Sequence, residues 1–164
     1  MHGARSPRPS IPSAITLMLM TTEERLAQLP PKLQSVVKTL GSAPKVIKTE
    51  MLLEFAKKMP PLPEGMQGKL EQVHECTTPF FVHAELENNQ VHLFFDAPKE
   101  APTVRAFAGL LAEGLEGETP EAVLGVPEDF YTLAKLEEII TPLRLRGLQA
   151  VLARIKRQVR EAQG

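Results

Sequence analysis

The sequence is poor in the residues on which disulfide scaffolds and nucleic-acid binders depend. Its 164 residues contain one cysteine, one tyrosine and no tryptophan. A single cysteine excludes an internal disulfide and fits a reducing compartment, so we expect a cytoplasmic protein. Basic residues nearly balance acidic ones, 19 against 20, which leaves no overall field to attract nucleic acid or an anionic membrane. We therefore expect neither of these as a partner.

The motifs of common enzyme classes are also missing. There is no Gly-rich phosphate loop, because Gly109, Gly114 and Gly117 do not follow a predicted strand, and no serine-nucleophile elbow occurs. An apolar fraction of 43% and a charged fraction of 24% are typical of a soluble globular domain. The first twenty residues combine prolines and arginines with an apolar patch too short to span a membrane. We expect residues 1–20 to be a disordered leader and residues 21–164 to form a single domain.

Two helices are predicted in the N-terminal part of this domain. Apolar residues at helical spacing predict the first helix: Leu33, Val36, Val37 and Leu40. Gly41 is expected to end it, and Ser42 is expected to cap a second helix that runs towards Met59. The predicted inner face of this second helix consists of Ile47, Met51, Leu52 and Phe55.

A β-hairpin is predicted in the middle of the chain. Apolar and polar residues alternate from Phe80 to Glu87, and Asn88-Asn89 favours a tight turn because asparagine tolerates positive φ. The return strand places His92 opposite Glu85. The segment from Lys69 to His74 is a weaker candidate for a third strand.

The C-terminal half is predicted to be helical. One helix is expected near Pro102, one after Thr119-Pro120, a short one after Pro127, and the longest from Thr141-Pro142. The order of helices, antiparallel strands and helices predicts an α+β fold with a small sheet of about three strands packed against helices. Residues 85–138 are rich in acids and residues 144–160 in bases. These two regions could attract each other within the chain or each meet a partner, and we favour the attraction within the chain.

Cys76 is the main candidate for chemistry, because it lies at the predicted turn into the hairpin and is followed by Thr77, Thr78 and Pro79. His74 could favour its thiolate, whereas Glu75 would oppose it. A lone cysteine can also be a small buried hydrophobe without reactivity. A metal site formed by Cys76 with nearby histidines is conceivable, but the spacing is not that of a structural zinc site, and we expect no bound metal.

From about Pro31 to Val159 the chain resembles the SufE family. The similarity is carried by motifs in the family's order: Val73-x-x-Cys76, the stretch Glu100-Ala101-Pro102-Thr103-Val104-Arg105, the Thr119-Pro120 helix start, and Ile140-Thr141-Pro142-Leu143-Arg144-Leu145-Arg146-Gly147-Leu148. The chain departs from the family where Glu75, Thr78 and Phe81 replace a glycine, a serine and a tryptophan.

This resemblance implies a curved antiparallel sheet with helices against it, a fold shared with the IscU/NifU scaffold proteins. It implies an accessory protein, not itself an enzyme, whose Cys76 accepts persulfide sulfur from a cysteine desulfurase, stimulates that enzyme and passes the sulfur to an iron–sulfur scaffold. Pyridoxal phosphate would belong to the desulfurase, and this chain would bind no cofactor.

Three further residues are given supporting roles: His74, Glu100 and Arg144. Arg144 is expected either to pair with a carboxylate or to act at the thiol, and Glu100 either to act at the thiol or to stabilise a helix start. We expect the resting thiol to lie in an apolar pocket lined by Phe80 and Phe81, and a loop around residues 65–78 to move on docking. Two alternatives remain open, an IscU-like cluster or zinc scaffold and an interaction module in which Cys76 is structural. The chain could be a monomer or a homodimer.

Overall fold

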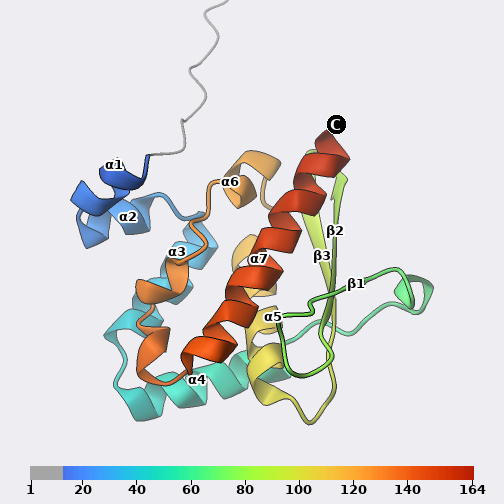
Figure 1. Ribbon diagram of the computed structural model, residues 1–164, viewed down its shortest axis with the longest axis horizontal. Coiled ribbons are helices and arrows are strands. Elements are labelled where there is room, and N and C mark those ends of the chain that lie inside the picture. The colour runs from blue at the N-terminus through green and yellow to red at the C-terminus, as the bar shows by residue number, and fades with distance from the viewer. Residues whose placement is uncertain (1–12) are drawn as a thin grey trace, which may run out of the picture.

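The computed structural model describes residues 13–164, and Figure 1 shows a small sheet beside a group of helices. The helices are α1 (Ala14–Leu19), α2 (Thr22–Ala27), α3 (Pro31–Ser42), α4 (Lys45–Lys57), α5 (Pro102–Leu115), α6 (Pro120–Leu124) and α7 (Pro142–Gln163). The strands are β1 (Glu71–Gln72), β2 (Phe81–Glu87) and β3 (Gln90–Asp96). Short 3-10 turns are η1 (Glu64–Met66), η2 (Phe130–Thr132) and η3 (Leu136–Glu138). The predicted α+β class is confirmed.

The sheet is antiparallel, in the order β1-β2-β3. The hairpin register runs from Phe81 opposite Asp96 to Glu87 opposite Gln90, and it places His92 opposite Glu85 as predicted. Asn88 and Asn89 form the turn with φ of 52° and 60°, a left-handed backbone that asparagine adopts at low cost. Helix α7 packs on β2, α5 contacts β3 and α7, and α3 and α4 pack on α5.

The predicted boundary between the first two long helices is wrong. Gly41 does not end α3, which continues to Ser42. A Cβ at Gly41 would lie 2.7 Å from the carbonyl oxygen of Leu133, so this glycine permits a close backbone approach. Ser42 does not cap α4. Its hydroxyl donates to the Lys38 carbonyl at 3.0 Å, and α4 begins after Pro44.

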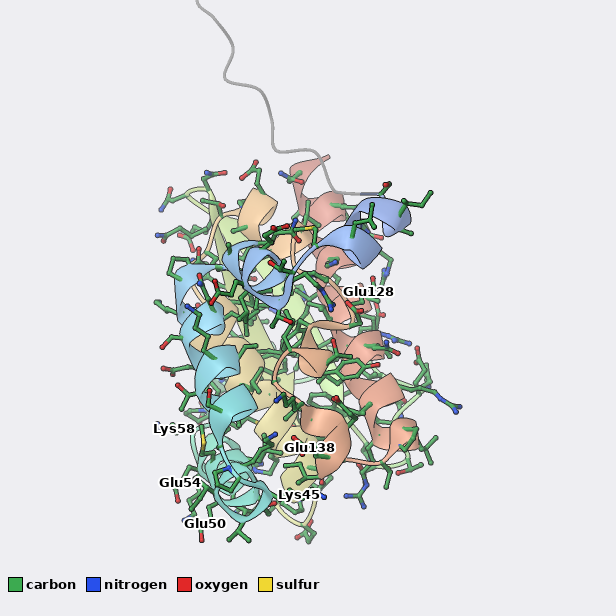
Figure 2. All side chains as sticks on the ribbon, turned by 90° about the vertical axis from the view of Figure 1, so that its left-hand side faces the viewer. Lys45, Glu50, Glu54, Lys58, Glu128 and Glu138 are labelled. Atoms are coloured by element: carbon green, nitrogen blue, oxygen red, sulfur yellow. The ribbon has the colours of Figure 1, made fainter. Side chains whose placement is uncertain are left out.

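The inner face of α4 also differs from the prediction. Ile47 is 46% exposed, whereas Lys48 is fully buried. The Lys48 ammonium donates to a Glu138 carboxylate oxygen at 2.7 Å and to the Lys135 carbonyl at 3.1 Å. Figure 2 shows Glu138 beside the start of α4, near Lys45. The expected short helix after Pro127 is two 3-10 turns, η2 and η3, and Lys135, directly before η3, has φ 54°.

The predicted starts of the C-terminal helices are confirmed. The Thr119 hydroxyl caps α6 by accepting from Ala122 N at 3.2 Å, and the Thr141 hydroxyl caps α7 by accepting from Arg144 N at 3.4 Å. Helix α7 buries its predicted apolar stripe: Leu148, Val151, Leu152, Ile155 and Val159. The side-chain Oε1 of Gln158 in α7 accepts from Ala84 N at 2.6 Å, which satisfies a backbone donor of β2 beyond the short pairing with β1.

The expected leader over residues 1–20 lies mostly outside the described residues, which begin at Ser13, and residues 14–19 form α1. Within residues 13–164, no helix has both the length and the apolar character that crossing a membrane requires.

Candidate functional site

Cys76 lies in a closed turn between β1 and β2. Val73 N donates to the Phe80 carbonyl at 2.7 Å, and Cys76 N donates to the Val73 carbonyl at 3.2 Å. Val73 and Phe80 are buried and fix both ends of the turn, whereas Thr77, Thr78 and Pro79 are exposed. The thiol is free and half-buried. The predicted location at a strand-to-strand turn is therefore confirmed.

Helix α7 supports this turn at two points seven residues apart. A Cβ built on Gly147 would lie 2.7 Å from Cys76 Sγ, so the thiol packs where any other residue would place a side chain. Two turns further along α7, the Arg154 guanidinium donates to both oxygens of Glu75 at 2.7 and 2.9 Å. Such a two-pronged pair fixes orientation as well as distance, and it holds the residue next to Cys76 against the helix.

A cavity of about 160 Å³ opens beside the thiol. The first turns of α5 and α7 form its far walls, with Val104 and Phe107 as a buried apolar floor and the half-exposed Leu143 at the rim. Glu100 and Arg144, both exposed, also line it. The structure thus brings Cys76, Glu100 and Arg144 to one cavity.

The other predicted site residue, His74, is not brought to this cavity. It lies exposed in the turn and is absent from the described residues that line the cavity. Arg144 does not form the expected carboxylate pair within residues 13–164. Its Nη1 instead donates to the Thr103 hydroxyl at 2.8 Å, which ties the start of α7 to the start of α5.

The electrostatic environment keeps the thiol in its neutral form. Burial raises the pKa of Cys76 above its ordinary value, the Glu75 carboxylate raises it further, and Arg154 lowers it. The pKa of Glu75 is itself lowered, mainly by its hydrogen bonds from Arg154. The resting site is therefore not that of an activated protease-type thiolate.

The expected aromatic lining of the thiol pocket is wrong. Phe80 is fully buried and stacks on Phe95 with ring centroids 6.1 Å apart, and neither Phe80 nor Phe81 lines the cavity. Phe81 is the first residue of β2 and Phe80 precedes it; Phe80 is buried in the core, whereas Phe81 is only partly buried. The aromatic residue in the cavity is Phe107, from α5.

The histidines of the sheet are engaged with carboxylates. His83 Nε2 lies 3.5 Å from Glu85, and His92 Nδ1 lies 2.8 Å from Glu116. Among residues 13–164, no three histidine, cysteine, aspartate or glutamate side chains gather closely enough to hold a metal ion.

The expected attraction between the basic tail and the acidic region 85–138 is supported at one position: burial lowers the pKa of Lys156, and the charge of Glu128 acts against that shift. The ion pairs that the tail forms within residues 13–164 involve other acids. Arg154 contacts Glu71 and Glu75, and Arg157 contacts Glu71 and Glu161. In the described part of the chain, these ion pairs attach α7 to β1 and to the Cys76 turn, not to residues 85–138.

Sequence analysis placed Gly147 in a family motif and Arg154 in a basic segment, but it assigned neither residue a role at the site. Their spacing was a usable signal, because residues seven apart on a helix share a face. On this face Gly147 has no side chain and Arg154 has a positive charge. What the sequence did not show is that this face lies under the Cys76 turn.

Comparison with known proteins identifies the class to which this fold and site belong. The profile of the SufE family, described as an Fe-S metabolism associated domain, matches residues 34–159. An uncharacterized SufE-like protein of Mycobacterium tuberculosis is 47% identical over 138 residues, covering 83% of this chain and 96% of that protein. A cysteine desulfuration protein SufE of Plasmodium falciparum is 25% identical over 133 residues, covering 78% of this chain and 53% of that protein.

A solved structure shares the fold. The solution structure of a hypothetical protein from Thermus thermophilus is 58% identical, with a TM-score of 0.77, and the match covers 82% of this chain and 98% of that one. The chain therefore belongs to the SufE family, as its motifs predicted, and its role lies in iron–sulfur metabolism.

Proposed function

We propose that this chain is a sulfur acceptor and carrier that takes sulfane sulfur from a cysteine desulfurase onto Cys76. In this reaction the Cys76 thiolate attacks the outer sulfur of a persulfide on the partner's cysteine. The sulfur–sulfur bond in the partner breaks, the partner's cysteine leaves as a thiolate, and Cys76 becomes the persulfide. Electrons balance without an external oxidant, as in any thiol–disulfide exchange.

The observation that carries this proposal is the position of Cys76 Sγ, against Gly147 and at the edge of the cavity. A persulfide adds one sulfur beyond Sγ, and a cavity of about 160 Å³ provides room for it. A purely structural cysteine would need no such space. The half-buried position also limits the access of stray reductants to a loaded sulfur.

Two features of the cavity favour an anionic outer sulfur, and two carboxylates oppose it. Arg144 places a guanidinium on its wall, and α5 begins there at Pro102 without a side-chain cap from any described residue. The first N–H groups of a helix carry partial positive charge. Arg144 and the start of α5 thus support a persulfide anion that points into the cavity, whereas Glu75 and Glu100 oppose it.

The raised pKa of Cys76 also affects how well it would carry sulfur. A thiol of higher pKa is a poorer leaving group, so attack on the outer sulfur by a passing nucleophile is slowed. The same shift lowers the fraction of thiolate at neutral pH, which leaves the partner to activate the thiol when it docks. Movement of the loop around residues 65–78 would expose Cys76 at that step.

The implied partners follow from this chemistry. Pyridoxal phosphate belongs to the desulfurase, which this chain stimulates by removing its product sulfur. The sulfur then passes to an iron–sulfur scaffold in the cytoplasm. This chain acts as a monomer or a homodimer and needs no cofactor of its own.

The test is to incubate the protein with a cysteine desulfurase and cysteine and then to measure its mass by mass spectrometry. We expect a mass gain of one sulfur atom that is absent from Cys76→Ser and is removed by a reductant. A desulfurase that turns over without transferring sulfur to this chain would contradict the proposal. Alkylation of native Cys76 addresses the rival interpretation of an interaction module, because a structural core cysteine would resist the reagent.

A further inference from the structure

The cavity beside Cys76 carries opposite charges at its mouth and apolar groups at its floor. Arg144 lines it from the first turn of α7, and Glu100 lines it from the loop before α5. Both side chains are exposed, whereas Val104 and Phe107 beneath them are buried. A site with this arrangement suits a small ligand that has both a positive and a negative group around a short apolar stem.

The charges of Glu100 and Arg144 are available to such a ligand. Within the described residues, neither side chain takes part in an ion pair, in contrast to Glu75, whose two oxygens are both occupied by Arg154. Arg144 uses Nη1 for Thr103. A guanidinium has five N–H donors in a planar fork, so its other edge can still receive a carboxylate.

The size of the cavity limits what can bind there. An engineered cavity of about 150 Å³ holds benzene, which has six heavy atoms. The cavity beside Cys76, at about 160 Å³, is similar in volume and open at its mouth. A free amino acid of the size of cysteine fits this space.

We propose that this cavity binds a free α-amino-acid thiol of the size of cysteine and that the persulfide on Cys76 passes its outer sulfur to that thiol. Arg144 holds the carboxylate, Glu100 holds the ammonium group, and the short side chain points across Val104 towards Cys76. This inference rests on the proposed function, because it requires a sulfur already carried by Cys76.

The transfer is balanced. The thiolate of the bound amino acid attacks the outer sulfur of the Cys76 persulfide, and the bond between Cys76 Sγ and that sulfur breaks. Cys76 leaves as a thiolate and takes up a proton, and the product is the persulfide of the free amino acid. The sulfur therefore gains a diffusible outlet that needs no scaffold protein.

The experiment compares three thiols on the loaded protein. Cys76 is first converted to its persulfide with inorganic polysulfide, the excess is removed, and loss of one sulfur is followed by mass spectrometry. The thiols are cysteine, cysteamine, which lacks the carboxylate, and 3-mercaptopropionate, which lacks the ammonium group. Each rate is divided by the rate of the same thiol with a persulfidated peptide of residues 73–80, which removes differences in intrinsic reactivity.

We expect the normalised rate for cysteine to exceed that of each truncated thiol by about tenfold, and to saturate with cysteine concentration, because one charge-assisted contact contributes about that much. Arg144→Gln should make cysteine and cysteamine equal, and Glu100→Gln should make cysteine and 3-mercaptopropionate equal. Arg160→Gln, which removes an exposed cation at the far end of α7, should preserve both preferences.

Equal normalised rates for the three thiols on the wild-type protein would overturn this inference, whatever the variants do. That result would leave the proposed function intact, since the protein would still carry sulfur. If Cys76 instead accepts sulfur from neither polysulfide nor a desulfurase, the proposed function fails together with this inference. The thiol series on the wild-type protein decides the question even if a variant is poorly folded.

Discussion

Replacement of Gly147 by alanine tests the central contact of the site. The new Cβ would lie 2.7 Å from Cys76 Sγ, roughly 1 Å inside the ordinary contact distance of about 3.5–4.0 Å. If the thiol stayed in place, overpacking of this kind would cost about 1–3 kcal/mol of unfolding free energy. Alanine also favours a helix over glycine by about 1 kcal/mol, which offsets part of that cost.

We expect the thiol to yield, because Sγ lies at the end of a short side chain on an exposed turn. In Gly147→Ala it should rotate towards solvent, so the unfolding free energy should change by no more than about 1 kcal/mol. Loss of burial should lower the pKa of Cys76, since burial is the main cause of its elevation. Alkylation of the native protein by iodoacetamide should then be several-fold faster, and urea unfolding gives the stability.

A matched control is Gly65→Ala, because a Cβ at Gly65 would meet no atom within 4 Å and Gly65 does not line the cavity. This variant should keep the wild-type alkylation rate. If Gly147→Ala also kept both the wild-type alkylation rate and the wild-type stability, Sγ could not lie against Gly147, and the described geometry of the site would be refuted. If Gly147→Ala kept the wild-type alkylation rate but lost about 1–3 kcal/mol of unfolding free energy, the turn would hold the thiol in place.

Three further predictions concern the charges that hold the fold and the site. Glu75→Gln should lower the pKa of Cys76, measured by thiolate absorbance, because the Glu75 charge raises that pKa, and should cost no more than about 1 kcal/mol because the pair with Arg154 is partly exposed. Arg157 lowers the pKa of Glu71, and Arg154 lowers the pKa of Glu75, from the ordinary value of 4.5. The two ionised glutamates therefore stabilise the folded protein above pH 4.5, and this stabilisation is lost as the pH falls through their folded pKa values. Urea unfolding between about pH 3 and pH 7 should show this loss, and Arg154→Gln should reduce it. Lys48→Met should change the unfolding free energy by no more than about 1 kcal/mol. Glu138→Gln should destabilise the protein more, because it leaves the buried Lys48 ammonium without its carboxylate. Equal losses of stability in thermal unfolding would contradict this order.

The parts of the fold that the sequence predicted well are those set by local patterns. The alternation from Phe80 to Glu87 and the two asparagines at the turn determine the hairpin register, because a slip of one residue would turn every apolar side chain to the wrong face. The Thr-Pro helix starts were predicted for a similar reason, since a cap and a proline act within one turn of helix.

The errors lie where distant segments decide the local structure. Gly41 resembles a helix C-cap in sequence, yet it is required inside α3 by the backbone of Leu133, a residue far along the chain. Lys48 is buried because Glu138 and the Lys135 carbonyl surround its ammonium, and no pattern within α4 indicates these partners. Periodicity reports which face of a helix is apolar but not what that face meets.

The candidate site shows the same division. Cys76 could be singled out from its uniqueness and its place before the hairpin, whereas the walls of its cavity come from α5 and α7, which only tertiary packing brings together. The assignment of both Phe80 and Phe81 to one pocket could have been excluded from the sequence alone. Neighbouring residues of a strand point to opposite faces, and Phe80 belongs to the core face.

Glu75 explains how this chain can depart from its family beside the Cys76 thiol. A glycine at this position would give the turn backbone freedom, whereas glutamate gives it an anchor, because Arg154 binds both carboxylate oxygens. The same carboxylate raises the pKa of Cys76, and Arg154 partly counteracts it. Burial is the main cause of the raised pKa, and this ion pair contributes both to that pKa and to the position of the turn against α7. A partner that displaces Glu75 from Arg154 would therefore change both properties together.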